Sequence, residues 1–305
     1  MIDSVNFVYF GNNSCYNNIN NIIMGNIQQE LKKRNIIYYI NDLKCKINSV
    51  NIITHLENSY STNRCISNGK LIAINHGFAI KNYLKGIAKD NQHIINKCDK
   101  FIIFNNRWKQ EFKHIGVNKN KLHICGSGKI DYLFELQKQI PEEENTICFA
   151  PTHNNGIWKT TSSYPKMLDY FDNNKYNFII SPHPFNAKNY IPSTESLCRS
   201  KVVIADSGST IYEAMILGKP VIFPDFLVRK GIHNIFRGSL EDEIYEKQIG
   251  YHIINSNNID NIIEKALNEG VLENQKDFIN ENYDFSILGK YGEMTVDVIE
   301  RFLNK

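Results

Sequence analysis

The stretch Lys201–Phe226, KVVIADSGSTIYEAMILGKPVIFPDF, sets the tightest limit on how the chain can fold. Its apolar start, Val202–Ala205, leads into the polar turn Asp206–Thr210. Apolar residues then recur at helical spacing from Ile211, and Gly218 ends them before a second apolar run. This order predicts a buried parallel strand, a tight turn, a short helix and another strand. The pattern is typical of the α/β class.

The turn Asp206–Thr210 offers hydroxyl groups and backbone N–H groups at the start of the predicted helix. The N-terminus of a helix favours an anion, because the macrodipole is positive there. We therefore predict that this turn holds the diphosphate of a nucleotide-activated donor. Gly208, without a side chain, can take positive φ and lets phosphates approach the backbone closely. The alternative is that Asp206 and Ser207 only cap the helix.

The same alternation of strands and helices runs along the 305 residues, although Asp42–Lys70 carries little pattern. That length suits two domains. The acidic, patternless stretch Pro141–Glu144 interrupts the alternation, and we interpret it as a linker. We predict two Rossmann-like parallel-sheet domains facing across a cleft, with residues 1–140 on the acceptor side and 145–285 on the nucleotide-donor side. Residues 286–305 are expected to form a C-terminal helix able to pack back on the first domain.

The composition narrows the function classes. A net charge of +3 is too mild to indicate nucleic-acid binding. The chain shows neither a transmembrane stretch nor a leader-like N-terminus, and its seven cysteines are odd in number and lack metal-ligand spacing. We therefore expect a cytoplasmic protein with reduced cysteines, and contact with the inner face of a membrane stays open. The oligomeric state is not specified.

Motifs for several other chemistries are absent from the sequence. The chain contains no GxxxxGK[ST] loop, no HExxH and no GxSxG. The first predicted strand leads to GNNS instead of GxGxxG, which disfavours nicotinamide and flavin enzymes. We expect no cofactor and no metal site.

Five polar turns follow directly on predicted strands. Ligands of parallel α/β sheets bind at the carboxyl ends of the strands, so these turns are the expected site. The turns are His76-Gly77, Gly126–Lys129, Pro151–Gly156, His183-Pro184 and Asp206–Thr210.

Two histidines in these turns are the candidate catalytic residues. Histidine titrates near neutrality, so His76 suits a general base acting on a hydroxyl. His183 lies between two prolines that fix its backbone, and its imidazole can donate to phosphate oxygens. The alternatives are a structural histidine at position 76 and a merely rigid strand exit at 183.

The remaining candidates are donor-binding residues. Glu213 lies one turn into the helix and can reach ribose hydroxyls, unless it is a solvated surface carboxylate. Lys81 can neutralise phosphate charge, unless it is solvated. Thr152 and His153 can flank the nucleotide base. The other candidates are the hydroxyls of Ser207, Ser209 and Thr210, the backbone at Gly208, and Lys129.

Taken together, the turns resemble those of CDP-glycerol glycerophosphotransferases, the teichoic-acid and capsule enzymes of the GT-B fold. The resemblance covers roughly Leu71 to Phe302. The matching stretches are His76-Gly77 with Lys81 (HGTPLK in the family), Gly126–Asp131 with Leu133 (GxPRND-x-L), Phe149–Thr152 (YAPT), His183-Pro184 (HP) and Asp206–Glu213 (DYSSxxFD).

The sequence departs from the family pattern at several positions. Phe78-Ala79-Ile80 replaces Thr-Pro-Leu, Gly128 replaces proline, Ile130 replaces asparagine, and Gly208 replaces the first serine. These departures bear on the identity of the donor more than on the fold. Asp206-Ser207-Gly208 and Glu213 are also similar to the corresponding stretch of UDP-N-acetylglucosamine 2-epimerases, which share the fold.

The resemblance implies an inverting, metal-independent transferase. It would move a glycerol-phosphate or sugar-like unit from a nucleotide-activated donor, CDP- or UDP-linked, to a hydroxyl of a polysaccharide or lipid-linked acceptor in teichoic acid, capsule or lipopolysaccharide. His76 would take the acceptor proton, while Ser209, Thr210 and His183 would stabilise the departing phosphate. The alternatives are a UDP-N-acetylglucosamine 2-epimerase or hydrolase, a sugar-transferring glycosyltransferase, and a protein that only binds nucleotide.

Overall fold

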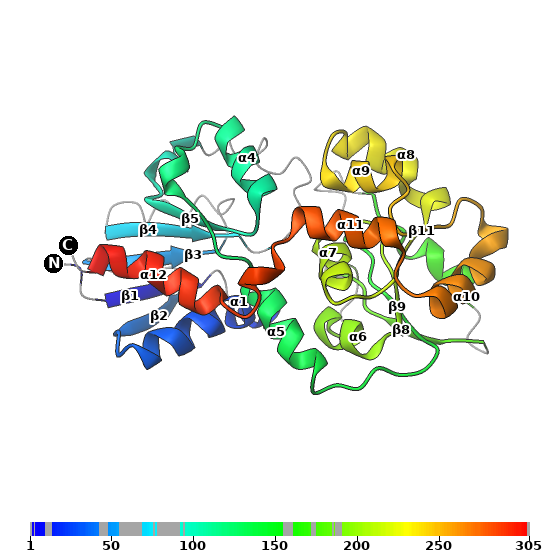
Figure 1. Cartoon of the computed structure of the whole chain (residues 1–305), viewed down its shortest axis with the longest axis horizontal. Helices are drawn as coiled ribbons and strands as arrows, with labels where there is room; N and C mark the ends of the chain where they lie inside the picture. The colour runs from blue at the N-terminus through cyan, green and yellow to red at the C-terminus, as the bar shows by residue number, and fades with distance from the viewer. Residues whose placement is uncertain are drawn as a thin grey trace. The chain divides into compact units, whose positions relative to one another are not determined.

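The computed structural model describes residues 2, 4–9, 14–42, 48–54, 69–75, 77, 92, 93, 95–154, 161–171, 175–184, 186 and 191–303 (Figure 1). The chain divides into two compact units. The first comprises Met1–His76, Asn82–Tyr132 and Asn282–Lys305, and the second comprises Gly77–Lys81 and Leu133–Glu281.

The first unit contains a six-stranded sheet in the order β2-β1-β3-β4-β5-β6, and all of its neighbouring strands run parallel. Its strands are β1 (Ser4–Tyr9), β2 (Tyr38–Asp42), β3 (Ser49–Ile53), β4 (Gly69–Ile74), β5 (Lys100–Ile103) and β6 (Leu122–Ile124). Its helical elements are α1 (Ser14–Lys33), α4 (Asn106–His114), η1 (Lys119–Lys121), η4 (Phe285–Ile287), α12 (Tyr291–Leu303) and the start of α5 (Gly128–Gln137).

Polar side chains inside this sheet pair with each other across strands. The Asn6 amide donates to the Asn51 side-chain oxygen at 2.8 Å, and the hydroxyls of Ser4 and Ser49 are 2.8 Å apart. All four residues are buried. Because each polar group has a partner on the neighbouring strand, β1 and β3 can sit side by side in the interior of the sheet.

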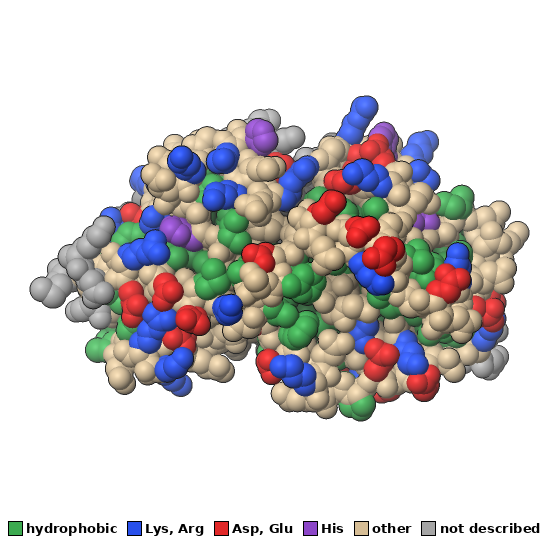
Figure 2. Space-filling model, in the orientation of Figure 1, with side chains coloured by type: hydrophobic (Ala, Val, Ile, Leu, Met, Phe, Trp, Pro, Cys, Tyr) green, Lys and Arg blue, Asp and Glu red, His purple; other side chains and the backbone are tan. Residues whose placement is uncertain are grey.

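The C-terminal helix α12 returns to pack on α1 (Figure 1). Val296 and Ile299 share a buried cluster with Ile27 of α1. Beside this cluster the Arg34 guanidinium pairs with Asp297 at 2.7 Å and with Glu300 at 2.8 Å. Acidic and basic side chains accordingly lie side by side over α1 and α12 (Figure 2).

The second unit contains a five-stranded sheet in the order β11-β10-β9-β7-β8, which is also parallel throughout. Its strands are β7 (Thr146–Phe149), β8 (Asn177–Ile180), β9 (Val202–Ile204), β10 (Val221–Phe223) and β11 (Tyr251–His252). Its helical elements are η2 (Lys166–Tyr170), α6 (Ser193–Arg199), α7 (Ser209–Ile216), α8 (Asp225–Phe236), α9 (Leu240–Glu246), η3 (Ser256–Asn258), α10 (Ile259–Glu269) and α11 (Glu273–Asn282).

Two parallel-sheet α/β domains confirm the predicted fold class. Apolar runs such as Val202–Ile204 are completely buried, as expected for parallel strands covered on both faces. Among the described residues, no helix combines the length and the apolar character needed to cross a membrane.

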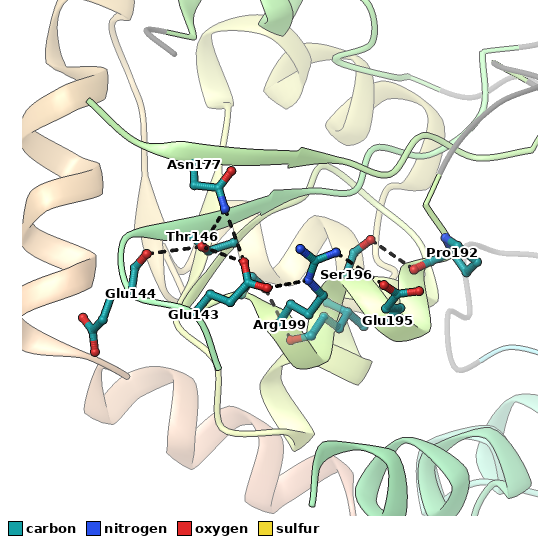
Figure 3. A network of polar contacts seen from close by, with 10 residues as sticks. Glu143, Glu144, Thr146, Asn177, Pro192, Glu195, Ser196 and Arg199 are labelled. Carbon is teal, nitrogen blue, oxygen red and sulfur yellow. Dashed lines mark hydrogen bonds and ion pairs between the residues drawn. The ribbon is translucent and has the colours of Figure 1, made fainter. Parts of the chain in front are cut away.

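The acidic stretch Pro141–Glu144 is fastened to the second unit. The Glu142 carboxylate pairs with the buried ammonium of Lys219, and Glu144 pairs with Lys201 at 2.6 Å. Glu143 pairs with Arg199 at 2.7 Å and accepts a bond from Asn177 at 3.3 Å (Figure 3). Asn177 begins β8, so this network lies at the amino end of the sheet, away from the predicted ligand edge.

Candidate functional site

Three of the predicted turns lie at the carboxyl ends of neighbouring strands in the second unit. Thr152 and His153 follow β7, His183 follows β8, and Asp206–Thr210 follows β9. Since β7 lies between β8 and β9, the three turns share one edge of the sheet. That edge is where α/β sheets bind their ligands.

The Asp206 side chain joins two of these turns to a third segment. Its Oδ1 accepts the backbone N–H of Thr152 at 2.8 Å and that of Ser207 at 2.7 Å. Its Oδ2 accepts the backbone N–H of Ser163 at 2.7 Å and the Ser163 hydroxyl at 2.8 Å. The segments that follow β7 and β9, and the one before η2, are therefore held by one fully buried carboxylate.

Complete burial raises the pKa of the Asp206 carboxyl, and the hydrogen bonds from Ser163, Thr152 and Ser207 oppose that rise. Three of these donors are peptide N–H groups, which can only donate. An acceptor-only carboxylate satisfies them all, so the geometry favours the ionised form. Asp206 thus stiffens the turn that we predicted to bind phosphate.

Helix α7 has a glycine as its N-cap residue, and this residue supplies no side-chain cap. This N-cap residue is Gly208, which has φ of 99°. The Asp206 carboxylate bonds to the N–H of Ser207 and to two other segments, and none of these bonds is to a residue of α7, so the interpretation of Asp206 and Ser207 as mere helix caps is wrong. The positive φ requires a residue such as glycine, as the sequence predicted for Gly208.

The Ser207 hydroxyl is the second unusual feature of this turn. The residue is only 2% exposed, and its Oγ has no hydrogen-bond partner among the described residues. A buried hydroxyl without a partner is costly and rare, so the Ser207 hydroxyl is a candidate hydrogen-bond donor to a ligand. The hydroxyl lies next to the start of α7.

Three other candidate side chains are in contact with each other or buried. The rings of His153 and His183 meet edge to face, with centroids 5.0 Å apart. Glu213 is 3% exposed, which rules out the alternative of a solvated surface carboxylate.

Asn186, which the sequence did not single out, connects the exits of β7 and β8. Its side-chain amide donates to the Thr152 carbonyl at 2.9 Å, and its backbone N–H donates to the His183 carbonyl at 2.7 Å. Its side-chain oxygen accepts the Asn154 N–H at 2.8 Å. Asn186 therefore links the position of His183 to that of Thr152. In the sequence, the signal for Asn186 is its place two residues beyond His183-Pro184.

A buried polar pair extends the same edge to β10 and β11. His252 Nδ1 lies 2.6 Å from the Asp225 carboxylate, and its Nε2 lies 3.1 Å from the carbonyl of Ile249. The carbonyl of Ile249 can only accept, so Nε2 donates to it, and the Asp225 carboxylate holds the other side of the ring. The adjacent Tyr245 hydroxyl donates to the carbonyl of Asp206 at 2.7 Å, which links α9 to the turn.

The remaining predicted residues lie elsewhere. His76 and Lys81 are outside the described residues. Lys129 lies in the first turn of α5, in the first unit. In the same turn Gly128 lets α5 pack directly on the carbonyl of Ile23 and the ring of Tyr291. Helix packing therefore explains this glycine without a ligand.

The comparisons with known proteins show the fold. No protein-family model matches the chain, and no curated protein matches its sequence significantly. The wall teichoic acid polymerase TagF has a similar structure, with a TM-score of 0.67 and 14% identity over 100% of this chain and 90% of that chain.

Two epimerases are also similar. UDP-GlcNAc 2-epimerase from Methanocaldococcus jannaschii gives a TM-score of 0.58 with 12% identity, covering 98% of this chain and 99% of that one. The enzyme from Neisseria meningitidis, bound to UDP-GlcNAc, gives 0.57 with 13% identity, covering 99% and 100%. Both enzyme families named from the sequence motifs are thus similar to this chain in structure, and the chain has the GT-B fold.

Proposed function

We propose that this chain is a GT-B transferase that moves a glycerol-phosphate or sugar unit from a nucleotide-activated donor, CDP-linked by preference, to a hydroxyl of a cell-surface glycopolymer. The acceptor would be a teichoic acid, capsule or lipopolysaccharide chain, on a polysaccharide or lipid carrier. The reaction would invert the transferred centre and need no catalytic metal.

The observation that carries this proposal is the glycine N-cap of α7 beside the Ser207 hydroxyl, which is buried and has no hydrogen-bond partner among the described residues. Such a helix start offers N–H groups and a positive dipole end to an anion. A donor diphosphate would accept from these groups and from the Ser207 hydroxyl. Gly208 would let the phosphate oxygens approach the backbone, as its positive φ permits.

The other predicted residues take their roles around that diphosphate. Ser209, Thr210 and His183 would donate to the phosphate that leaves with the nucleotide, which is where negative charge grows during transfer. Glu213 would bind the ribose hydroxyls, Thr152 and His153 would flank the base, and Lys81 and Lys129 would offset phosphate charge. His76 would remove the acceptor proton.

The test compares two serine variants in the same edge of the sheet. Ser207→Ala removes a hydroxyl that has no partner in the described part of the chain, so the melting temperature should hold. Nucleotide affinity should fall by roughly 1–3 kcal/mol, the value of a hydrogen bond to a charged group. Ser163→Ala is the matched control, because its hydroxyl already donates to Asp206 and its loss should lower stability. Thermal melts give the stability of each variant. Calorimetric titration with CDP, UDP and their activated derivatives gives the nucleotide affinity. Unchanged nucleotide affinity in Ser207→Ala would remove the main support for a donor site here.

The similarity to epimerases favours a second candidate, an isomerase or hydrolase that acts on UDP-N-acetylhexosamine. The products separate the two. Transfer from CDP-glycerol releases CMP and requires an acceptor, whereas the second reaction gives an epimer or free UDP from UDP-N-acetylglucosamine alone. Nucleotide binding without either reaction, across both donors, would indicate a protein that only binds.

A further inference from the structure

A cluster of three side chains of the types that ligate metals lies on α8 and α9, away from the strand-end turns. His233 lies near the end of α8, and Asp242 and Glu246 lie one turn apart on α9. The two helices lie side by side (Figure 1). One ring nitrogen and two carboxylate oxygens of the cluster all lie within 4.8 Å of one another.

The spacing of these atoms fits a small divalent cation. His233 Nδ1 is 3.0 Å from Asp242 Oδ1 and 3.5 Å from Glu246 Oε1. Zinc binds nitrogen and carboxylate oxygen at about 2.0–2.2 Å in a tetrahedron, so its neighbouring ligand atoms are ~3.3 Å apart. The two observed separations lie on either side of that value. A metal could enter with small side-chain adjustments.

The backbone fixes the central ligand. Asp242 Oδ2 accepts the N–H of Gly238 at 2.8 Å, and the Asp242 N–H is capped by the Ser239 hydroxyl. Asp242 is buried, so this bond aims Oδ1 at His233. A carboxylate held from behind by an N–H group is the kind of support that orients metal ligands in proteins.

The outer ligands remain open to solvent. The His233 side chain is 46% exposed and that of Glu246 is 59% exposed, so an ion can reach the cluster and keep water in a fourth position. Two carboxylates balance the charge of a divalent cation. Imidazole and carboxylate together suit zinc and similar transition metals better than calcium or magnesium.

We propose that His233, Asp242 and Glu246 bind one Zn²⁺ or a similar divalent transition metal, which would fasten α8 to α9. The role is structural and separate from the proposed metal-independent transfer. Tyr245, next to Glu246 on α9, donates its hydroxyl to the carbonyl of Asp206 at 2.7 Å. A metal that steadies α9 would therefore also steady the turn at the start of α7.

Cobalt tests the coordination directly. Metal-depleted full-length protein titrated with Co²⁺ should develop visible absorption of tetrahedral intensity that saturates at one equivalent, and Zn²⁺ should then displace the cobalt. Zn²⁺ should also raise the melting temperature. Each of these readouts is independent of catalysis and of nucleotide binding.

Variants assign the signal to the cluster. His233→Gln and Glu246→Gln should each weaken Zn²⁺ binding at least tenfold, while Glu243→Gln, on the same helix and paired with Lys247, should leave it unchanged. Asp242 is not replaced, because it also holds Gly238. Both test residues are exposed, so circular dichroism should show folded variants.

Two results would overturn the proposal. One is the absence of saturable one-to-one binding by the parent protein. The other is equal Zn²⁺ affinity in His233→Gln and the parent, which would place the metal on another histidine. In either case the cluster is an ordinary ion pair. A protein that binds Zn²⁺ but no nucleotide would keep this proposal and remove the proposed function.

Discussion

The Asp206 carboxylate accepts the backbone N–H of Thr152 at 2.8 Å, which joins the exits of β7 and β9 across 54 residues of sequence. Thr152 was predicted to lie beside the base of the donor, and Asp206 opens the turn predicted to hold its phosphates. One buried hydrogen bond thus fixes the spacing between two parts of the candidate site. It can be tested by removing the charge from the carboxylate.

Replacing Asp206 with Asn should destabilise the protein and weaken nucleotide binding together. An amide presents one N–H₂ group where the carboxylate presented an acceptor, and at least one buried N–H would lose its partner. The expected loss of unfolding free energy is about 2 kcal/mol or more, since a buried unsatisfied donor costs about 1–3 kcal/mol. Urea unfolding followed at two wavelengths measures it. An Asp206→Asn protein of parental stability would show that these bonds contribute little.

Replacing Gly208 with Ala should weaken donor binding strongly while the protein stays folded. An alanine at φ of 99° is strained by on the order of 1–3 kcal/mol, and relief of that strain would move the N–H groups at the start of α7. The apolar face of α7 at Ile211 and Met215 is buried and unchanged, so the helix should persist. Calorimetry with CDP and UDP measures the binding.

Ser209→Ala should have a smaller effect than Gly208→Ala. We expect it to weaken nucleotide binding by about 1–3 kcal/mol, the range for a hydrogen bond to a charged group. If the Gly208 and Ser209 variants both bind nucleotide as the parent does, the start of α7 is not the phosphate site.

His123 should make stability depend on pH. Burial, followed by the positive charges of Lys100, Arg301 and Lys109, lowers the pKa of His123 from 6.5 to about 4. The folded protein resists protonation that the unfolded chain accepts, so the stability is fully present above pH 6.5 and is lost as pH falls toward about 4.

A His123→Gln variant should therefore lose less stability than the parent between pH 6.5 and 4. Urea unfolding at half-unit steps across this range gives the two curves. Carboxylates titrate equally in both proteins, so the difference between the curves isolates the histidine. Parallel curves would mean that His123 protonates freely in the folded state.

Two glycines of the first unit should respond oppositely to alanine. A Cβ at Gly128 would overlap the backbone carbonyl of Ile23 and the ring of Tyr291, and overpacking of this kind typically costs about 1–3 kcal/mol. A Cβ at Gly25, inside α1, would meet nothing within 4 Å. Gly25→Ala should therefore stabilise the helix by roughly 0.5–1 kcal/mol. Thermal melts of the two variants would have to shift in opposite directions.

The two partners of the ion pair between Glu142 and Lys219 should differ in how much stability their substitution costs. Lys219 is 2% exposed, so Glu142→Gln leaves a buried ammonium without its counter-charge. We expect a loss of about 1–3 kcal/mol, below the value for a fully buried pair, because Glu142 itself is 43% exposed.

Lys219→Met should cost less than Glu142→Gln, since it replaces the buried charge with an apolar chain of similar size. In that background Glu142→Gln should cost almost nothing. A double-mutant cycle by urea unfolding tests the coupling, and additive losses would show that the two charges act independently.

The sequence was most informative where local pattern decides structure. Val202–Ile204 and Val221–Phe223 are apolar because they are buried on both faces of a parallel sheet, and Gly218 ends α7 with φ of 73°. Such features depend on near neighbours, so the fold class and the carboxyl-end turns of the second unit could be predicted from them.

Features that depend on distant partners could not be predicted. Strand β3 has Asn51 at its centre, and this polar side chain can be buried because it bonds to distant partners, among them Asn6, 45 residues away, and the carbonyl of Lys70. Helix α9 begins with three acidic residues typical of a solvated face, yet Glu241 and Asp242 are buried.

The same limit applies to the candidate site. The place of Ser207 and Gly208 in a turn at a strand end could be predicted, because the apolar run of β9 ends shortly before them. The role of Asp206 could not, because its donors Thr152 and Ser163 are 54 and 43 residues away in sequence. Asn186 and Tyr245 were missed for the same reason. Asn186 bonds to Thr152 after β7, and Tyr245, on α9, bonds to Asp206 after β9.

The fastening of the acidic stretch to the second unit determines how the protein can be divided. A fragment of the second unit that starts at Thr146, where β7 begins, would lack the carboxylates of Glu142, Glu143 and Glu144. Lys219 would then be buried without its Glu142 counter-charge, Lys201 would lose Glu144, and Arg199 would lose Glu143 while it keeps Glu195. An independently expressed second unit must therefore include Glu142, so the acidic stretch is part of that folding unit instead of a spacer that can be discarded.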